Sequence, residues 1–270
     1  MPGEIKPLSA VANTIDRVLQ AGSVAVLATL IEAPANVGAK LLFETDGTTT
    51  GSLGSAKLDE LVKKQATVFL TSGDDARAYF TSEFAPDDSE LGGLRFLFER
   101  LQPEPHVVIC GAGHVGASLA KLANAIGYTV TLIDDRPEFV SRNHFPEESI
   151  ELVSTPDWAD AVRRAVGNGR GVSVAIVTRG HNEDETCVRA LIDLEPDYVG
   201  LIGSKRRTNI VLERLREAGA SEEFRKNIRA PIGLDIGAIT PEEVALSILA
   251  EIVAERRGGE GTSLSGWRRK

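Results

Sequence analysis

The spacing of apolar and polar residues changes near residue 103, and the two sides of this point predict different kinds of domain. Before it, apolar residues recur at helical spacing between Leu8 and Leu19, and Gly22 supplies a helix stop. Asp46-Gly47 follows an apolar run and predicts a hairpin. Further runs predict strands at Val24–Ile31, Lys40–Thr45, Thr67–Thr71, Ala78–Phe84 and Leu94–Phe98. Residues 1–103 are therefore predicted to form a small α+β domain.

Beyond Pro103-Glu104-Pro105, where closely spaced prolines disfavour a helix, strand-like apolar runs alternate with amphipathic segments. Strands are predicted at His106–Cys110, Thr129–Ile133, Ile150–Val153, Val172–Val177 and Tyr198–Ile202. Helices are predicted at Gly113–Ile126, Asp157–Val166, Glu185–Leu194, Arg206–Ala218 and Pro241–Arg256. This alternation is typical of a parallel sheet covered on both faces. We predict an α/β chain with a Rossmann-like domain at 104–257 and a flexible tail at 258–270.

Composition and charge limit the classes of partner. The chain has 270 residues, of which 42% are hydrophobic and 26% charged, as in ordinary globular proteins. Its 30 basic and 39 acidic residues give a net charge of −9, which disfavours nucleic acid as a partner. No apolar run approaches the roughly 18–20 residues of a membrane helix, and the first residues lack a secretory signal pattern. Cys110 and Cys187 make neither a disulfide framework nor a zinc pattern, so we expect a cytoplasmic protein with buried thiols and no metal site.

The first predicted strand of the second domain runs into a glycine-rich turn. Gly111, Gly113 and Gly116 have G-x-G-x-x-G spacing, with a predicted strand before them and a predicted helix after them. The first glycine allows the tight turn, the second lets the backbone approach a phosphate, and the third lets helix pack on strand. Asp134 ends the next strand, where a ribose hydroxyl is commonly bound. Arg136 follows closely and is a candidate to meet a 2′-phosphate or a pterin phosphate; a solvated side chain is the alternative. A tight turn without any ligand remains the alternative interpretation.

A second turn of this kind follows the strand at Tyr198–Ile202. There Gly203 and Ser204 precede three cations, Lys205, Arg206 and Arg207, at a predicted helix start, where positive charge opposes the helix dipole. An anionic ligand would offset this cost; a solvated basic turn is the alternative.

Histidines and a threonine follow the ends of other predicted strands. Thr178 closes one strand just before His181, and His114 lies inside the glycine turn. His181 is a candidate proton carrier because its ordinary pKa is near ~6.5, although a local hydrogen-bonding role is equally consistent. Because ligands of open α/β sheets bind beyond the carboxyl ends of the strands, these turns together predict one ligand crevice.

The same residues resemble a known family. The segments PHVVICGAGHVGASLA, VTLIDDRPEFVSRNHFP, AIVTRGHNEDE, YVGLIGSKRR and PIGLDIGAITPEEVALSILAEIV are similar, in this order, to the C-terminal domain of the XdhC/CoxI-like family. Ala33–Lys40 and Gly51–Gly54 resemble segments of its N-terminal domain. These are accessory proteins in the maturation of xanthine dehydrogenase and carbon monoxide dehydrogenase.

The resemblance implies binding of the molybdenum cofactor, as molybdopterin or its dinucleotide form, and its transfer to a molybdenum hydroxylase apoenzyme. It also implies a cysteine desulfurase as partner during sulfuration, and a homodimer is a further expectation. One position departs from the family, because Lys57 stands where members commonly have a cysteine. Lysine cannot replace a thiolate as a soft ligand. An NAD(P)-dependent oxidoreductase, with Asp134 on the ribose and His181 as acid–base, is the alternative function.

Overall fold

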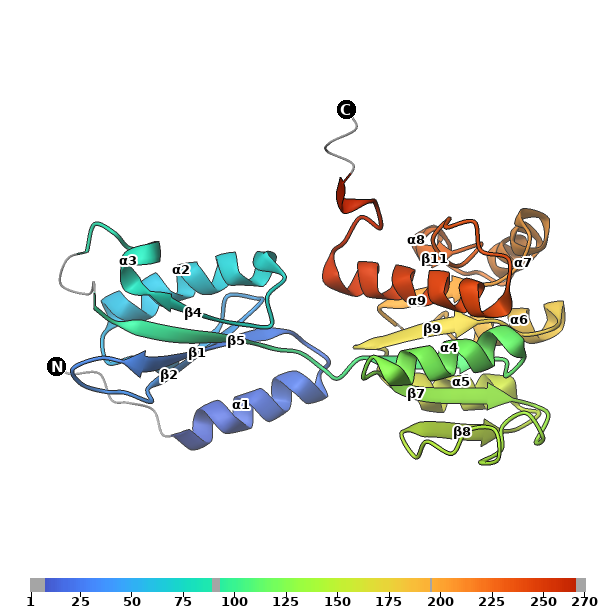
Figure 1. Ribbon diagram of the computed structural model, residues 1–270, viewed down its shortest axis with the longest axis horizontal. Helices are drawn as coiled ribbons and strands as arrows, with labels where there is room; N and C mark the ends of the chain where they lie inside the picture. The colour runs from blue at the N-terminus through green and yellow to red at the C-terminus, as the bar shows by residue number, and fades with distance from the viewer. Residues whose placement is uncertain (1–7, 89–92, 195, 266–270) are drawn as a thin grey trace. The chain divides into compact units, whose positions relative to one another are not determined.

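The computed structural model describes residues 8–88, 93–194 and 196–265. The last residues of the expected tail, 266–270, lie outside the described part of the chain. The chain divides into two compact units, Met1–Pro103 and Glu104–Lys270, each with its own sheet (Figure 1). Among the described residues, no helix combines the length and the apolar character that crossing a bilayer requires.

The N-terminal unit is built on an antiparallel sheet in the order β3-β2-β1-β5-β4. Its strands are β1 (Ala25–Glu32), β2 (Lys40–Glu44), β3 (Thr49–Ser52), β4 (Ala76–Phe80) and β5 (Arg95–Leu101). Its helices are α1 (Leu8–Gln20), α2 (Ala56–Ser72) and α3 (Thr81–Phe84). Alternate residues of β1 enter two different cores, because successive side chains of a strand point to opposite faces. Val26 and Ala28 pack with Phe69 of α2, whereas Ala25 and Leu27 pack with Val18 of α1.

The expected strand at Thr67–Thr71 is wrong, because these residues form the last turns of α2. Ser55 caps this helix by accepting a hydrogen bond from the Leu58 amide, and its buried residues recur at helical spacing. The helical period outweighs the local preference of Thr67 and Val68 for strands. The run Ala78–Phe84 is also divided, since the strand ends at Phe80 and α3 follows. The hairpin expected at Asp46-Gly47 is confirmed by the pairing of β2 with β3.

The C-terminal unit contains a parallel sheet in the order β11-β10-β9-β6-β7-β8. The strands are β6 (His106–Cys110), β7 (Thr129–Asp134), β8 (Ile150–Ser154), β9 (Val172–Ile176), β10 (Tyr198–Leu201) and β11 (Ile228–Arg229). The helices are α4 (His114–Ala125), α5 (Trp158–Val166), α6 (His181–Arg189), α7 (Lys205–Glu217), α8 (Glu222–Asn227) and α9 (Pro241–Arg257). The predicted α/β class and the Rossmann-like parallel sheet are confirmed.

Two apolar cores cover the two faces of this sheet. Helices α4 and α9 pack together over one face, in front of the sheet in Figure 1. Helices α5, α6 and α7 pack side by side over the other. Alternate residues of β6 separate accordingly: Val107 and Ile109 enter the first core, and Val108 and Cys110 the second. The side chains of this buried strand are therefore enclosed on both faces, which explains its uninterrupted apolar run.

One helix begins earlier than its apolar residues indicate. We expected Glu185–Leu194, but α6 spans His181–Arg189. Its first turn is polar and contains Glu183 and Asp184, whose charges are favourable at a helix N-terminus. The apolar pattern alone misses this turn because the buried apolar residues begin only at Cys187.

Candidate functional site

The turns that follow β6, β7, β9 and β10 lie along one edge of the parallel sheet. These strands are neighbours in the order β10-β9-β6-β7, so their carboxyl ends meet there. Strand β6 leads into α4 on one face, whereas β9 leads into α6 on the other. The chain direction therefore switches between β6 and β9, where open α/β sheets form their ligand crevices. Gly113 and Lys205 lie on this same edge, two strands apart.

The three glycines of the first turn have different roles. Gly111 has φ +112, and a methyl group there would lie 2.6 Å from the Val177 carbonyl oxygen. A methyl group at Gly116 would lie 1.8 Å from the Gly111 carbonyl oxygen. These two positions are glycine because the backbone packs closely around them. A methyl group at Gly113 would meet no atom within 4 Å, and Gly113 caps α4 with extended backbone. Packing does not require glycine at position 113, but close approach of a ligand would.

The carboxylate of Asp134 is buried and hydrogen-bonded to groups of the protein itself. Its side chain is 2% exposed and accepts a hydrogen bond from the Ala112 amide at 2.7 Å. The Arg136 guanidinium donates to both carboxylate oxygens, at 2.8 and 2.9 Å. Burial raises the pKa of Asp134, but the bonds from Arg136 and Ala112 outweigh it and hold the pKa below its ordinary value. A ribose hydroxyl would have to compete with these donors for the same oxygens.

The turn after β9 is tied to the turns on both sides of it. The Thr178 hydroxyl donates to Asp184 at 2.6 Å, and the Arg207 Nε donates to the same carboxylate at 2.9 Å. Burial raises the pKa of Asp184 above its ordinary value, and the bonds from Thr178 and Arg207 offset this rise only in part. Arg179 pairs with Asp135 at 2.8 Å, which connects this turn to the end of β7. Thr178 is thus buried and committed to this network rather than open to a ligand.

The second cationic turn presents two cations to solvent. Ser204 caps α7 by accepting a bond from the Arg207 amide, and Gly203 precedes it with φ +149. Arg207 is occupied by Asp184, but Lys205 and Arg206 are exposed. Within the described ranges neither forms an ion pair. Two cations in the first turn of a helix stay destabilising unless an anion approaches them.

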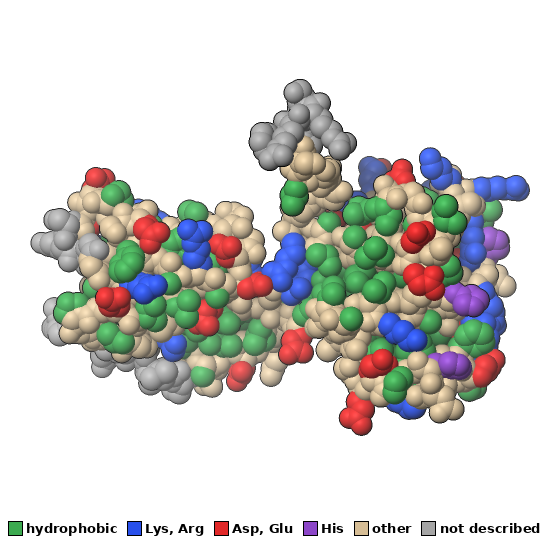
Figure 2. Space-filling model, viewed as in Figure 1, with side chains coloured by type: hydrophobic (Ala, Val, Ile, Leu, Met, Phe, Trp, Pro, Cys, Tyr) green, Lys and Arg blue, Asp and Glu red, His purple; other side chains and the backbone are tan. Residues whose placement is uncertain are grey.

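Histidine side chains gather at one side of the C-terminal unit together with Lys and Arg (Figure 2). Exposed histidines follow three strands of the edge: His114 after β6, His144 after β7 and His181 after β9. His181 is the first residue of α6, and no hydrogen-bond partner for its ring is found in the described part of the chain. The geometry thus offers no oriented acid–base pair at His181.

A hollow of about 380 Å³ opens beside Gly113 and His114. Its other walls come from α4 and from the connection between β7 and β8. The lining residues missed by sequence reasoning are Lys121, Glu138, Phe139, His144 and Phe145. Four of them lie in the segment VTLIDDRPEFVSRNHFP, which carries the family resemblance, but their positions in a connection without helix or strand period gave them no role in a site.

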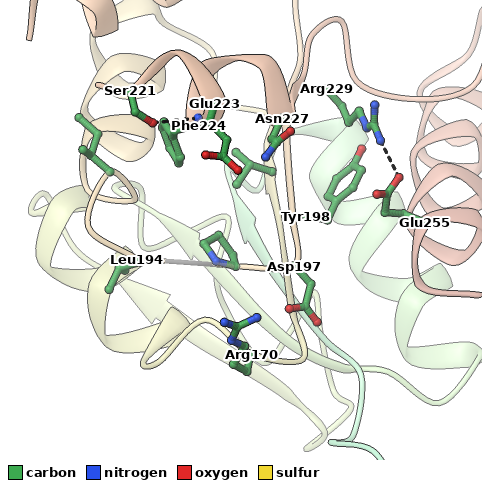
Figure 3. A pocket seen from close by; sticks show the side chains of 13 residues that line it. Arg170, Leu194, Asp197, Tyr198, Ser221, Glu223, Phe224, Asn227, Arg229 and Glu255 are labelled. Carbon is green, nitrogen blue, oxygen red and sulfur yellow. Dashed lines mark hydrogen bonds and ion pairs between the residues drawn. The ribbon is translucent and has the colours of Figure 1, made fainter. Parts of the chain in front are cut away.

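A larger hollow, of about 580 Å³, lies at the opposite edge of the sheet (Figure 3). Its polar groups largely satisfy one another. Arg229 pairs with Glu255 at 2.7 Å, and the Tyr198 hydroxyl donates to Glu251. Burial, and then the bond to Glu251, raise the pKa of Tyr198 well above its ordinary value, so its hydroxyl keeps its proton. The hollow lies at the amino ends of β9 and β10, away from the glycine turn.

The two cysteines are buried, as expected. Cys110 ends β6 and Cys187 lies in α6, and both are fully buried in the same core. The hydrogen bond with Cys110, followed by burial, raises the pKa of the Cys187 thiol, which keeps it protonated and unreactive. Among the described residues, no three His, Cys, Asp or Glu side chains are grouped to hold a metal ion.

In the N-terminal unit, the two segments named by the resemblance lie side by side. A methyl group at Gly54 would lie 2.7 Å from the Asn36 Nδ2, so the turns after β1 and β3 touch. Lys57 stands in the first turn of α2, and its ammonium pairs with Asp88 at 2.5 Å.

A parallel sheet with helices on both faces, a glycine turn at its switch point and exposed cations along its carboxyl edge define a Rossmann-type domain. The chain belongs to the XdhC and CoxI family. The XdhC Rossmann domain model matches residues 107–252, and the XdhC and CoxI family model matches residues 18–80.

Similar proteins agree with this assignment. The chain is 26% identical to a probable xanthine dehydrogenase subunit of Bacillus subtilis over 80% of its own length and 57% of the relative's. It is 33% identical to the molybdenum cofactor insertion chaperone PaoD of Escherichia coli over 57% of its length and 41% of PaoD. The chain thus spans about half the length of these curated relatives.

A solved structure shares the fold. The crystal structure described as a xanthine dehydrogenase from Bacillus halodurans matches with a TM-score of 0.52 at 18% identity, over 96% of this chain and 99% of that one.

Substituting alanine for Gly116 or Gly113 should separate the packing role from the binding role. Gly116→Ala forces a methyl group against the Gly111 carbonyl and should lower the free energy of unfolding by about 1–3 kcal/mol. Gly113→Ala places its methyl group in open space and should change the free energy of unfolding by less than about 1 kcal/mol, because the weaker N-cap and the lower entropy of the unfolded chain oppose each other. Urea denaturation of the three proteins measures both. Equal losses would show that Gly113 is also a packing glycine.

Replacing Asp134 with asparagine should destabilise the fold in a pH-dependent manner. The folded pKa of Asp134 is lowered, so its stabilising contribution is complete above the unfolded value of 3.8 and is lost as pH falls through the folded pKa. Asp134→Asn should cost about 1.5–3 kcal/mol near pH 7. The difference between wild type and variant should shrink below pH 3.8. A difference that is constant from pH 7 to pH 2 would contradict this role.

Proposed function

We propose that this chain is an accessory factor that binds the molybdenum cofactor and passes it to a xanthine dehydrogenase-type molybdenum hydroxylase. Family membership supports the class of function, and the names of two relatives support the cofactor and the client. The observation that carries the proposal is the open backbone at Gly113, at the start of a helix and on the same edge as the exposed cations Lys205 and Arg206.

The residues of this edge fit the phosphate end of such a cofactor. Amides at the start of α4 and the positive end of its dipole favour an anion. Gly113 has no side chain and leaves room for close approach. Gly203 and Ser204 place Lys205 and Arg206 at the turn after β10, two strands away on the same edge. The bound cofactor would supply the molybdenum chemistry, while this chain holds the phosphate and keeps the cofactor from bulk solvent.

The N-terminal unit bears on sulfuration. Lys57 carries no thiolate, and both cysteines are buried in the C-terminal unit. We therefore assign the sulfur-carrying step to a cysteine desulfurase partner rather than to a side chain of this chain.

The proposal predicts that a negative charge at Gly113 abolishes cofactor binding. Gly113→Asp should reduce the cofactor that co-purifies from a molybdenum-replete host at least tenfold, because the carboxylate occupies and repels the phosphate position. Lys205→Ala combined with Arg206→Ala should reduce it severalfold. Mass spectrometry of the released pterin and metal analysis measure both. Ala125→Asp, which adds the same charge at the exposed far end of α4, is the matched control and should retain wild-type cofactor.

Two outcomes would overturn this function. One is cofactor content unchanged in Gly113→Asp. The other is saturable binding of NADH or NADPH with an absorbance change on adding a substrate, which would establish the oxidoreductase alternative.

A further inference from the structure

The hollow beside Gly113 has the size and walls of a small-molecule subsite. Its volume of about 380 Å³ lies within the roughly 300–1,000 Å³ typical of ligand pockets. Residues from two parts of the chain form it: the cap Gly113 with Ala117 and Lys121, which follow at one-turn spacing along α4, and Glu138, Phe139 and Phe145 from the β7–β8 connection. A ligand phosphate at the glycine turn would therefore lie at the mouth of this hollow.

The aromatic walls are held in place. Phe145 is 1% exposed and belongs to the apolar core, and the Lys121 ammonium lies 5.6 Å from its ring centroid. The Arg136 guanidinium lies 3.7 Å from the Phe139 centroid and is itself fixed by Asp134. Asp134 thus positions a ring wall as well as the glycine turn. Phe139, with Arg136 over its ring, and the buried Phe145 thus give the hollow a fixed apolar wall beside the anion position, which suits a ring that carries a phosphate.

The polar groups of the hollow restrict which ring fits. An ionised carboxylate such as that of Glu138 accepts hydrogen bonds and donates none. It therefore matches a ring edge with two neighbouring N–H donors. Guanine and pterin share such an edge, formed by a ring N–H beside a 2-amino group. Adenine and cytosine present an amino donor beside a ring acceptor, and the lone pair of that acceptor would face and repel the carboxylate oxygen.

We propose that this hollow binds the 2-amino-4-oxo ring of a pterin or guanine phosphate and that Glu138 selects it. The inference rests on the proposed function, because it places the ring of the same ligand whose phosphate lies at Gly113. His114, next to Gly113, and Lys121 and His144, which line the same hollow, supply further hydrogen-bonding groups for the ligand.

Nucleotide binding measured by calorimetry tests the ring preference directly. GMP should bind the full chain at least tenfold more tightly than AMP or CMP. Glu138→Gln should reduce this preference to less than threefold, because the amide can both donate and accept. Glu148→Gln, an exposed carboxylate of the same connection that does not line the hollow, is the matched control and should keep the full preference.

Filling the hollow gives a second, independent test. Ala117→Leu places a larger side chain within its lining and should weaken GMP binding at least tenfold, whereas Ala125→Leu on the exposed end of α4 should leave it unchanged. Thermal unfolding of each variant verifies that it is folded. The same titrations with 6-hydroxymethylpterin phosphate distinguish the two sources of the ring, since the tighter of the two ligands identifies whether the pterin or a guanine nucleotide occupies the hollow.

The outcomes separate this inference from the proposed function. Equal affinity for GMP, AMP and CMP, no binding of GMP or the pterin phosphate, or an unchanged preference in Glu138→Gln would overturn the ring assignment. If the ring preference is absent but molybdenum cofactor still co-purifies with the chain and is lost in Gly113→Asp, the proposed function stands without the ring assignment. If the ring preference is absent and no molybdenum cofactor co-purifies with the wild-type chain, the proposed function itself is wrong.

Discussion

The carboxylate of Asp134 is the interaction on which the carboxyl edge depends. It ends β7, accepts the Ala112 amide of the neighbouring turn and holds Arg136, whose guanidinium covers Phe139. A buried carboxylate is stable only with such donors, so the turn and the arginine are fixed relative to the strand ends. One side chain thus gives the glycine turn its shape and the adjacent hollow one of its walls.

Close packing at the switch point explains why the same motif contains both structural and exposed glycines. Gly111 and Gly116 are needed because the turn after β6, the start of α4 and the backbone after β9 pack so closely that no space is left for a methyl group. Gly113 faces open space beside the hollow. The rest of the edge is made rigid by Thr178, Asp184 and Arg207, which leaves Lys205 and Arg206 as exposed cations available to an anion. Rigid turns around an open position are what preorganised anion binding requires.

Much of the C-terminal fold follows from local pattern. The strand at His106–Cys110 and the start of α9 at Pro241 have the residues expected, because a buried strand and a capped helix both leave strong local signals. The strand predicted at Thr67–Thr71 was wrong, because a helix whose apolar face is formed by Leu58, Val62 and Phe69 can end in residues that favour strands. The start of α6 was missed because its first turn is polar and its stabilising partners come from the turn after β9 and from α7.

The sequence by itself determined the parallel sheet, the glycine turn and the turns that carry cations, because each depends on residues close together in the chain. Only the tertiary structure decided that the Asp134 carboxylate is hydrogen-bonded to Ala112 and Arg136. It also decided that Arg207 pairs with Asp184, whereas the two preceding cations stay exposed. It alone revealed the hollow between α4 and the β7–β8 connection. The physical reason is that hydrogen-bond partners and cavity walls are chosen among residues distant in sequence, for which spacing along the chain carries no signal.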